Sequence, residues 1–363
     1  MSVQLVEERR YDQIMKDCVL PDLASCRSDG WMISHDGGED GGILLDKAHL
    51  SGVDPSRLLH YVCYDRTLFR QGAVESGSAR VRGAVIISFG FSEFADKYQE
   101  MAWYFLMQGY SVCIPEHWGH GFSGRGVNDP SLIWVDHWQR YVADLAAFCS
   151  QVGQQYAQDE PMVLYAHSMG GGVAARMLET FPSLIDKAVL SSPMIAPRTG
   201  FMPSVAWTAT NAACIMGRSR SIVPGFGPFR PELDMGKYPN GSQARVSWTH
   251  KLRAKELHYQ TSAATFGWVR ESLEMSRAIL RSDRCSRVET PLLLFQAQPD
   301  RFVLPIPQNR FVDQVQQGGC QATLVRIPGS MHELYQMPDN VLRPYLERIF
   351  DFFDQPWQLA DDR

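Results

Sequence analysis

The 363-residue sequence predicts an α/β protein, in which a mainly parallel sheet is flanked by helices and carries an inserted helical cap. Two observations support this class. Short runs of β-branched and apolar residues alternate with longer stretches of helical periodicity, as expected for strands joined by crossover helices. From residue 196 to residue 284 the alternation stops, and the chain instead holds Pro/Gly turns and amphipathic stretches that contain tryptophan.

We therefore divide the chain into a core and an insertion. Residues 1–195 form the first part of the core, residues 196–284 the cap, and residues 285–363 the second part of the core. Residues 201–217 of the cap carry no charge. A buried cap helix is the favoured interpretation of that run. The alternative is a mobile lid that lines an acyl-chain site or touches a membrane surface.

The core elements follow from the residue pattern. The predicted strands are residues 84–89, 111–115, 162–165, 187–191, 292–297 and 322–327. The predicted helices are residues 97–107, 134–151, 171–180 and 341–353.

Composition excludes several functional classes. The net charge of −5 lacks the basic excess of a nucleic-acid-binding protein. No stretch is apolar enough to span a bilayer, and the first residues do not resemble a secretory signal. The eight cysteines are scattered without a C-x-x-C pair, which indicates free thiols rather than a disulfide or zinc framework. We expect a cytoplasmic protein that needs no metal or cofactor. Its oligomeric state is left open.

The most informative segment is the turn after the predicted strand 162–165. Here the sequence Ala166-His167-Ser168-Met169-Gly170 follows the small-x-Ser-x-Gly pattern of a nucleophile elbow. The residues two before and two after the serine must be small, because the chain nearly folds back on itself. Ala166 stands where the usual pattern has glycine, and Gly170 meets the demand. The pattern indicates a nucleophilic serine at the start of a helix.

A serine nucleophile needs a base and an acid, which follow it in the order Ser, Asp, His in proteins with this elbow. Asp300 follows the predicted strand 292–297, and His332 follows the predicted strand 322–327. Because the carboxyl ends of parallel strands meet at one edge of a sheet, we expect both to lie beside Ser168. The sequence thus predicts a catalytic triad.

Attack on a carbonyl also needs two oxyanion donors. One is the backbone N–H of Met169, and the other is the backbone N–H of Phe91, which follows a strand and Gly90. The glycine-rich run 116–124 has no phosphate-binding pattern, so we expect a structural turn at the mouth of the site.

These motifs together resemble the serine-hydrolase family of monoacylglycerol lipases and lysophospholipases, most closely its bacterial lysophospholipase L2 branch. The segments that carry the resemblance are Gly90-Phe91-Ser92-Glu93, Glu116-His117-Trp118-Gly119-His120-Gly121, His167-Ser168-Met169-Gly170-Gly171, Thr265-Phe266-Gly267-Trp268-Val269 and Met331-His332-Glu333. The resemblance covers roughly residues 83–353. Three positions depart from the family pattern, namely Ala166, Phe89 and Glu116. None of them removes a catalytic group.

The resemblance implies an α/β-hydrolase fold, no cofactor, the triad Ser168, Asp300 and His332, and oxyanion donors at Phe91 and Met169. It implies hydrolysis of the acyl ester of a single-chain lipid, either a lysophospholipid or a monoacylglycerol. Peripheral contact with the inner face of a membrane is left open, as an alternative to a protein that stays in the cytosol. Two alternatives stay open. One is a small-ester carboxylesterase or an acyltransferase with the same triad. The other is a non-catalytic ligand-binding protein of the same fold.

Overall fold

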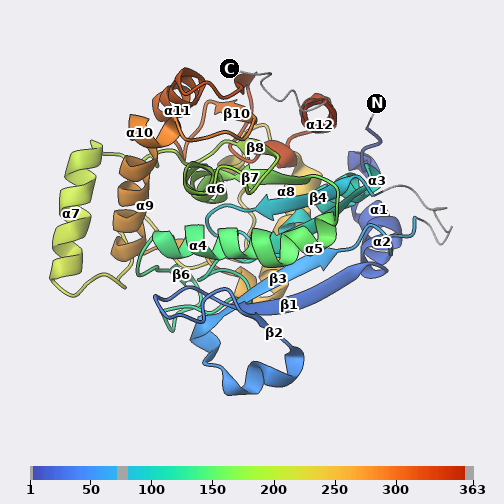
Figure 1. The fold of residues 1–363 in the computed structure, drawn as a ribbon. Coiled ribbons are helices and arrows are strands. Elements are labelled where there is room, and N and C mark those ends of the chain that lie inside the picture. Colours follow the sequence, from blue (N-terminus) through green and yellow to red (C-terminus); the bar gives the residue numbers. More distant parts are fainter. Residues whose placement is uncertain (1–2, 72–80, 356–363) are drawn as a thin grey trace.

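The fold is described from a computed structural model, which describes residues 3–71 and 81–355. Its centre is a nine-stranded sheet with the strand order β11-β10-β8-β7-β4-β5-β3-β1-β2 (Figure 1). The strands of this sheet are β1 Arg27–Ile33, β2 Leu44–Leu45, β3 Leu58–Tyr64, β4 Gly83–Ser88, β5 Tyr110–Pro115, β7 Met162–His167, β8 Lys187–Ser191, β10 Leu292–Gln298 and β11 Ala322–Pro328.

The sheet is parallel from β11 to β5 and antiparallel from β5 to β2. In the parallel part every residue of β4, β5, β7 and β8 is buried, because helices cover both faces. The observed strands match the six predicted strands to within two residues at each end. The α/β prediction is therefore confirmed.

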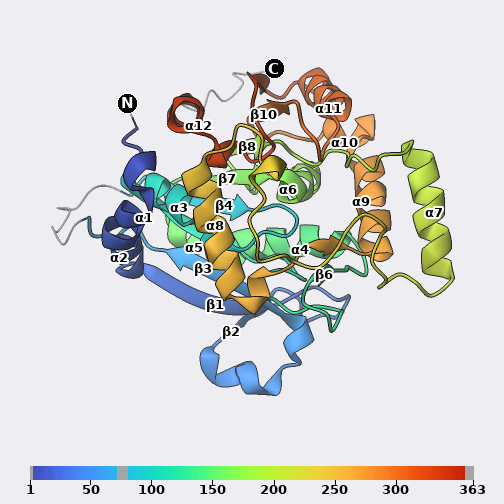
Figure 2. The same ribbon diagram turned by 180° about the vertical axis from the view of Figure 1, so that it is seen from behind.

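Two layers of helices cover the sheet. One apolar core, which includes Tyr141 and Phe311, lies between the sheet and the face of α4, α6 and α11. The other core lies between the opposite face and α1, α2, α3, α8 and α12, as the two opposite views show (Figure 1, Figure 2). The helices are α1 Tyr11–Ile14, α2 Leu20–Ala24, α3 Gln99–Met107, α4 Gln139–Phe148, α5 Gln154–Ala157, α6 Ser168–Thr180, α7 Pro203–Ile215, α8 Gln243–Lys255, α9 Phe266–Ile279, α10 Ser282–Cys285, α11 Pro305–Gln317 and α12 Asp339–Asp354.

The helix predicted over residues 134–151 begins and ends at later residues in the structure than the sequence pattern indicated. The chain is still extended at β6 Leu132–Ile133, because this short strand pairs with β9 Ala263–Ala264. Helix α4 starts at Gln139 and continues through a π-helical turn, Cys149–Gly153, into α5. Strand β9 lies within residues 196–284, where the sequence pattern indicated no strand, and both of its residues are buried.

Helices α7, α8 and α9 lie between β8 and β10 in the chain. Thr265 caps α9 by accepting a hydrogen bond from the Trp268 N–H, and Ser242 caps α8 in the same way from the Arg245 N–H. Helix α8 is tied to the core because the buried Arg245 guanidinium pairs with Glu100 on α3 at 3.0 Å.

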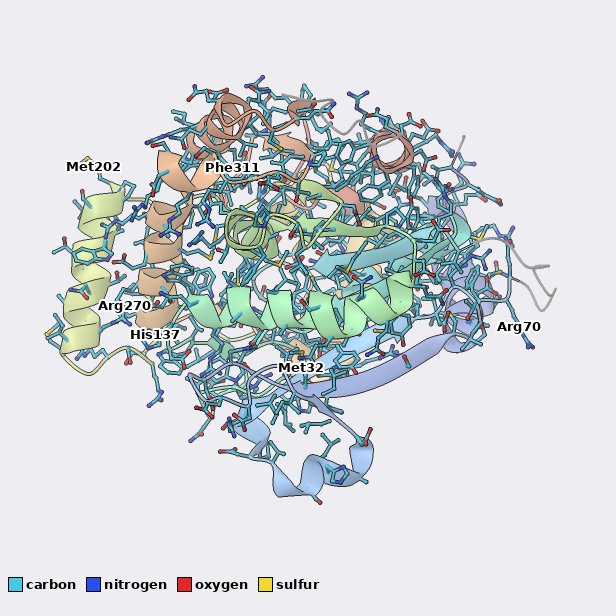
Figure 3. All side chains as sticks on the ribbon, viewed as in Figure 1. Met32, Arg70, His137, Met202, Arg270 and Phe311 are labelled. Carbon is cyan, nitrogen blue, oxygen red and sulfur yellow. The ribbon has the colours of Figure 1, made fainter. Side chains whose placement is uncertain are left out.

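Helix α7 stands at the edge of the molecule and packs against α9 (Figure 1). Within α7 only Ala206, Thr210 and Ala213 are buried. The apolar side chains at its two ends face solvent: Phe201, Met202, Ile215 and Met216 are 74%, 68%, 78% and 70% exposed. Figure 3 shows Met202 at the upper end of this helix, where it begins. The favoured interpretation of residues 201–217 as a buried helix is therefore wrong, because α7 buries only a narrow stripe of small residues.

Candidate active site

Ser168 occupies the tight turn between β7 and α6. Its φ of 51° lies in the left-handed region that non-glycine residues rarely adopt. The turn runs so close to β4 that a Cβ atom at Gly170 would lie 2.3 Å from the Ser88 carbonyl oxygen. Ala166 is fully buried at the end of β7, so its methyl group is accommodated there. The strained turn lifts the Ser168 hydroxyl above the carboxyl ends of the strands.

The predicted triad residues lie together at this edge. The His332 Nε2 atom is 2.8 Å from Ser168 Oγ, and the His332 Nδ1 atom is 2.7 Å from Asp300 Oδ2. The carboxylate holds the imidazole with Nδ1 protonated, so Nε2 is free to accept the serine proton. The other Asp300 oxygen, Oδ1, accepts hydrogen bonds from the N–H groups of Phe302 and Val303, which fix its orientation.

Burial and charge set the protonation states of this pair. Burial by itself raises the pKa of Asp300, but the hydrogen bond and positive charge of His332 outweigh it, so the pKa lies below its ordinary value. Burial by itself lowers the pKa of His332, but the Asp300 hydrogen bond and charge outweigh it and raise the pKa. The site is therefore arranged to stabilise an imidazolium as it forms.

The predicted oxyanion donors lie next to Ser168: Met169 follows it in the chain, and Gly90, the neighbour of Phe91, is so close that a Cβ atom on it would lie 2.9 Å from Ser168 Cβ. Met169 is in the first turn of α6, where backbone N–H groups have no partner within the helix. Phe91 is in a turn closed by the hydrogen bond from the Glu93 N–H to the Gly90 carbonyl. In the described ranges 3–71 and 81–355, no hydrogen bond uses the Phe91 N–H. Both groups are thus available to a developing anion.

The sequence reasoning missed the role of Glu93, which holds the Phe91 turn in place. This carboxylate is buried, and it accepts hydrogen bonds from the Gly90 N–H at 2.5 Å and Lys97 Nζ at 2.6 Å. It also accepts from the hydroxyls of Tyr98 at 2.7 Å and Tyr335 at 2.5 Å. Burial by itself raises the pKa of Glu93, but the positive charge of Lys97 reverses the effect and lowers the pKa.

Tyr335 lies three residues after His332, so Glu93 links the oxyanion turn to the histidine loop. His167 lies beside this link, with its ring centroid 4.8 Å from that of His332. Its Nδ1 lies 3.1 Å from the Ser191 carbonyl oxygen, and burial lowers its pKa to about 3, so it is a neutral spacer. The sequence held one signal for this role: Glu93 is a charged residue three positions after Gly90, which follows the predicted strand 84–89.

The glycine-rich run 116–124 is a structural turn, as predicted. The buried Glu116 carboxylate accepts hydrogen bonds from the Ala95 and Phe122 N–H groups, so it joins this turn to the segment after the oxyanion turn. It also lies 2.9 Å from His60 Nδ1. Burial by itself lowers the pKa of His60, but hydrogen bonds to Asp29 and Glu116 raise it to about 9.

A cavity of about 530 Å³ borders the oxyanion turn and Glu333, the residue after His332, although the triad side chains themselves do not line it. Phe91 lines it on the oxyanion side. Phe302, whose ring centroid is 5.1 Å from that of His332, lines it on the histidine side. Residues 225–238 and helix α8 form its outer wall. The cavity is therefore placed to receive part of a substrate bound at Ser168.

The parallel sheet, the strained serine elbow and the hydrogen-bonded triad define a serine hydrolase of the α/β-hydrolase fold. A comparison with family models agrees with this class. The model described as "Serine aminopeptidase, S33" matches residues 79–339. The chain belongs to this family.

Similar proteins include lysophospholipases and monoacylglycerol lipases. Lysophospholipase L2 of Escherichia coli is 30% identical over 275 residues, which cover 75% of this chain and 80% of that protein. A monoacylglycerol lipase of Mycolicibacterium smegmatis is 23% identical over 261 residues, which cover 72% of this chain and 85% of that protein.

Solved structures support the fold. A monoglyceride lipase of Saccharomyces cerevisiae matches with a TM-score of 0.63 at 17% identity, over 82% of this chain and 91% of that chain. A carboxyl esterase of Bacillus coagulans matches with a TM-score of 0.65 at 16% identity, over 91% of this chain and 98% of that chain. In the part of the chain that is described, none of the helices has the length and apolar character needed to cross a membrane.

Proposed function

We propose that this chain hydrolyses the acyl ester of a single-chain lipid through an acyl-enzyme, with Ser168, His332 and Asp300 as the triad. The observation that carries the proposal is the continuous hydrogen-bonded chain from Ser168 Oγ through His332 to Asp300, at 2.8 and 2.7 Å. The names of the relatives, lysophospholipase L2 and monoacylglycerol lipase, support a lysophospholipid or a monoacylglycerol as the substrate.

In the first half of the reaction, His332 Nε2 takes the Ser168 proton as Oγ attacks the ester carbonyl. The carbonyl oxygen becomes an oxyanion, which accepts hydrogen bonds from the Phe91 and Met169 N–H groups. The C–O bond to the alcohol then breaks, and the imidazolium of His332 gives its proton to the leaving alcohol. The acyl group remains on Ser168.

In the second half, water enters and His332 takes one of its protons. The hydroxide oxygen attacks the acyl carbonyl, and the same two N–H groups stabilise the second oxyanion. The bond to Ser168 Oγ breaks, the proton returns from His332 to Oγ, and the fatty acid leaves. Asp300 stays ionised in both halves and stabilises the imidazolium.

The exposed apolar ends of α7 support peripheral contact with a lipid surface, from which a single-chain lipid would enter the site. We expect this contact at the inner face of the cytoplasmic membrane. The buried, unpaired cysteines, such as Cys113 and Cys149, are consistent with the reducing environment of the cytoplasm.

A fluorophosphonate probe tests the nucleophile. We expect labelling of the native chain and none of Ser168→Ala. Absence of labelling in the native chain would favour a ligand-binding protein without turnover. Labelling that survives Ser168→Ala would place the nucleophile elsewhere.

A substrate panel then tests the ester class. It contains lysophospholipids, monoacylglycerols, short p-nitrophenyl esters and an aminoacyl anilide, with release of fatty acid or chromophore as the readout. We expect the highest kcat/KM with a long-chain single-acyl lipid. A preference for short esters with no release of fatty acid from lipids would instead support a carboxylesterase. An acyltransferase would give acylated alcohol in preference to free fatty acid when an alcohol acceptor is added.

A further inference from the structure

The cavity near the triad is lined by charged side chains of both signs. Its lining includes three cations and three anions, namely Arg230, Lys237, Arg253, Glu232, Asp234 and Glu333. In residues 3–71 and 81–355, none of these six side chains forms an ion pair. A cavity that serves only a neutral glycerol group needs no such charges, because hydroxyl groups are satisfied by uncharged partners.

Arg253 is the best placed of these groups. It projects from α8, and its Nε donates to the Tyr259 carbonyl oxygen at 2.9 Å while its Nη2 donates to the Thr261 carbonyl oxygen. Its guanidinium also lies over the Phe229 ring, 5.1 Å from the centroid. These contacts hold the guanidinium in one orientation and leave Nη1 without a partner among the described residues. Burial lowers the pKa of Arg253, so an anion in the cavity would relieve an unfavourable charge.

The position of the cavity relative to His332 identifies which part of the substrate it receives. The leaving alcohol must lie within reach of His332, because this residue protonates it. Two residues that border the cavity lie next to His332. Phe302 packs against the His332 ring, and Glu333 follows His332 in the chain. The cavity therefore borders the residues next to His332, which protonates the leaving alcohol, and its charged lining suits the polar head of a lipid ester.

We propose that this cavity is a headgroup site for a zwitterionic glycerophospho alcohol, in which Arg253 and Lys237 bind the phosphate and Glu232 and Asp234 bind the ammonium group. The proposal rests on the ester hydrolase function proposed above. The free Nη1 group of Arg253 can donate charge-assisted hydrogen bonds to a phosphate oxygen. The equal number of acidic groups disfavours a headgroup with a net negative charge. A lysophospholipid is accordingly preferred over a monoacylglycerol with the same acyl chain.

The test compares two substrates that share one scissile ester. Octanoyl lysophosphatidylcholine and monooctanoylglycerol are used below their critical micelle concentrations, so that binding to a lipid surface does not contribute. We expect Arg253→Gln to lower kcat/KM for the lysophospholipid by about 10- to 100-fold and to change that for the monoacylglycerol by less than about twofold. The matched control is Lys255→Gln, which removes a charge from the same helix outside the cavity lining. It should change neither value.

The outcomes separate the possible explanations. An equal loss with both substrates would assign Arg253 a purely structural role and overturn the headgroup site. A native chain that hydrolyses the monoacylglycerol but not the lysophospholipid would also overturn it, while the lipid hydrolase function would stand. A native chain that hydrolyses neither lipid but cleaves short esters would overturn the proposed function itself. The rate of labelling by a small neutral fluorophosphonate checks that each variant retains an intact triad.

Two exposed residues keep the proposal testable if Arg253→Gln does not fold. Lys237→Gln should lower kcat/KM for the lysophospholipid several-fold with no change for the monoacylglycerol. Glu232→Gln should reduce the preference for a phosphocholine headgroup over an anionic phosphoglycerol headgroup. If neither variant changes the ratio between its paired substrates, the charges do not contact the headgroup and the proposal fails.

Discussion

Replacing Glu93 with glutamine removes the charge that holds the oxyanion turn. The native carboxylate accepts four hydrogen bonds, from the Gly90 N–H, Lys97 Nζ and two tyrosine hydroxyls. A glutamine side chain has one carbonyl oxygen and one NH2 group, so at least one of these donors then faces another donor. A tyrosine hydroxyl can rotate and accept instead, but the Gly90 N–H and the Lys97 ammonium cannot.

The stability effect follows from the buried pair. Lys97 and Glu93 side chains are 10% and 5% exposed, so the substitution leaves an almost buried ammonium without its counter-ion. Removing one partner of such a pair costs about 3–5 kcal/mol of unfolding free energy. The pKa of Glu93 is lowered in the fold, so its contribution is complete above its ordinary pKa near 4.5 and is lost only as the pH falls through the lower folded value. The comparison should therefore be made at pH 7 by urea denaturation, with Glu39→Gln on an exposed loop as the control.

The catalytic effect is separable from the stability effect. Because Glu93 fixes the Gly90 peptide group and so the next N–H, of Phe91, we expect kcat to fall by about 10²- to 10³-fold, the usual cost of losing one oxyanion donor. The double variant Glu93→Gln/Lys97→Met removes the unpaired charge, and should recover at least about 2 kcal/mol of stability without recovering kcat. If kcat returns together with stability, or if neither changes in Glu93→Gln, the assigned role of Glu93 is wrong.

Three further predictions use the triad, the elbow and α7. Asp300→Asn should lower the plateau value of kcat by about 10³- to 10⁴-fold. The ratio kcat/KM rises with pH as His332 loses its proton, and the raised pKa of His332 depends on Asp300, so the acid limb of the pH profile should move to lower pH in this variant. An acid limb that does not move would contradict the assignment. Gly170→Ala places a Cβ atom 2.3 Å from a carbonyl oxygen of β4. We therefore expect loss of fluorophosphonate labelling and a decrease of about 1–3 kcal/mol in the free energy of unfolding, measured by urea denaturation. The control Gly52→Ala, whose added Cβ meets no atom within 4 Å, should change neither quantity. Ile215→Ser should weaken co-sedimentation with anionic vesicles while leaving turnover of a monomeric short ester unchanged; equal vesicle binding would exclude the end of α7 from membrane contact.

The sequence was sufficient for the parts of the molecule that local rules determine. Buried parallel strands appear as continuous apolar runs, so the strands from β4 to β11 in the parallel sheet could be placed to within two residues. The elbow requires small residues at fixed offsets, and Asp300 and His332 follow strands whose carboxyl ends share one edge. The distances between Ser168, His332 and Asp300 agree with that expectation.

Other features depend on contacts between distant segments, and no local pattern predicts them. Glu93 and Tyr335 are separated by 242 positions, and their hydrogen bond links two loops whose sequences give no sign of the partner. The exposure of α7 likewise depends on how the segment between β8 and β10 packs against the rest of the molecule. A run of uncharged residues predicts a buried helix. In the structure, α7 packs against α9, its buried residues are only Ala206, Thr210 and Ala213, and the apolar side chains at both of its ends are exposed to solvent.

Helices α7 and α8, which lie between β8 and β10, differ in how they contact the rest of the molecule. Helix α8, which carries Arg253, is fixed by the fully buried Arg245, whose guanidinium pairs with Glu100 at 3.0 Å and Asp339 at 2.8 Å. A charged headgroup needs donors at fixed positions, because charge-assisted hydrogen bonds depend on geometry. Helix α7 has α9 as its main neighbour and no charged residue of its own. No residue of α7 lines the cavity that we propose for the headgroup. Substitutions on α8 should therefore change the choice of headgroup, while substitutions on the exposed ends of α7 should leave it unchanged.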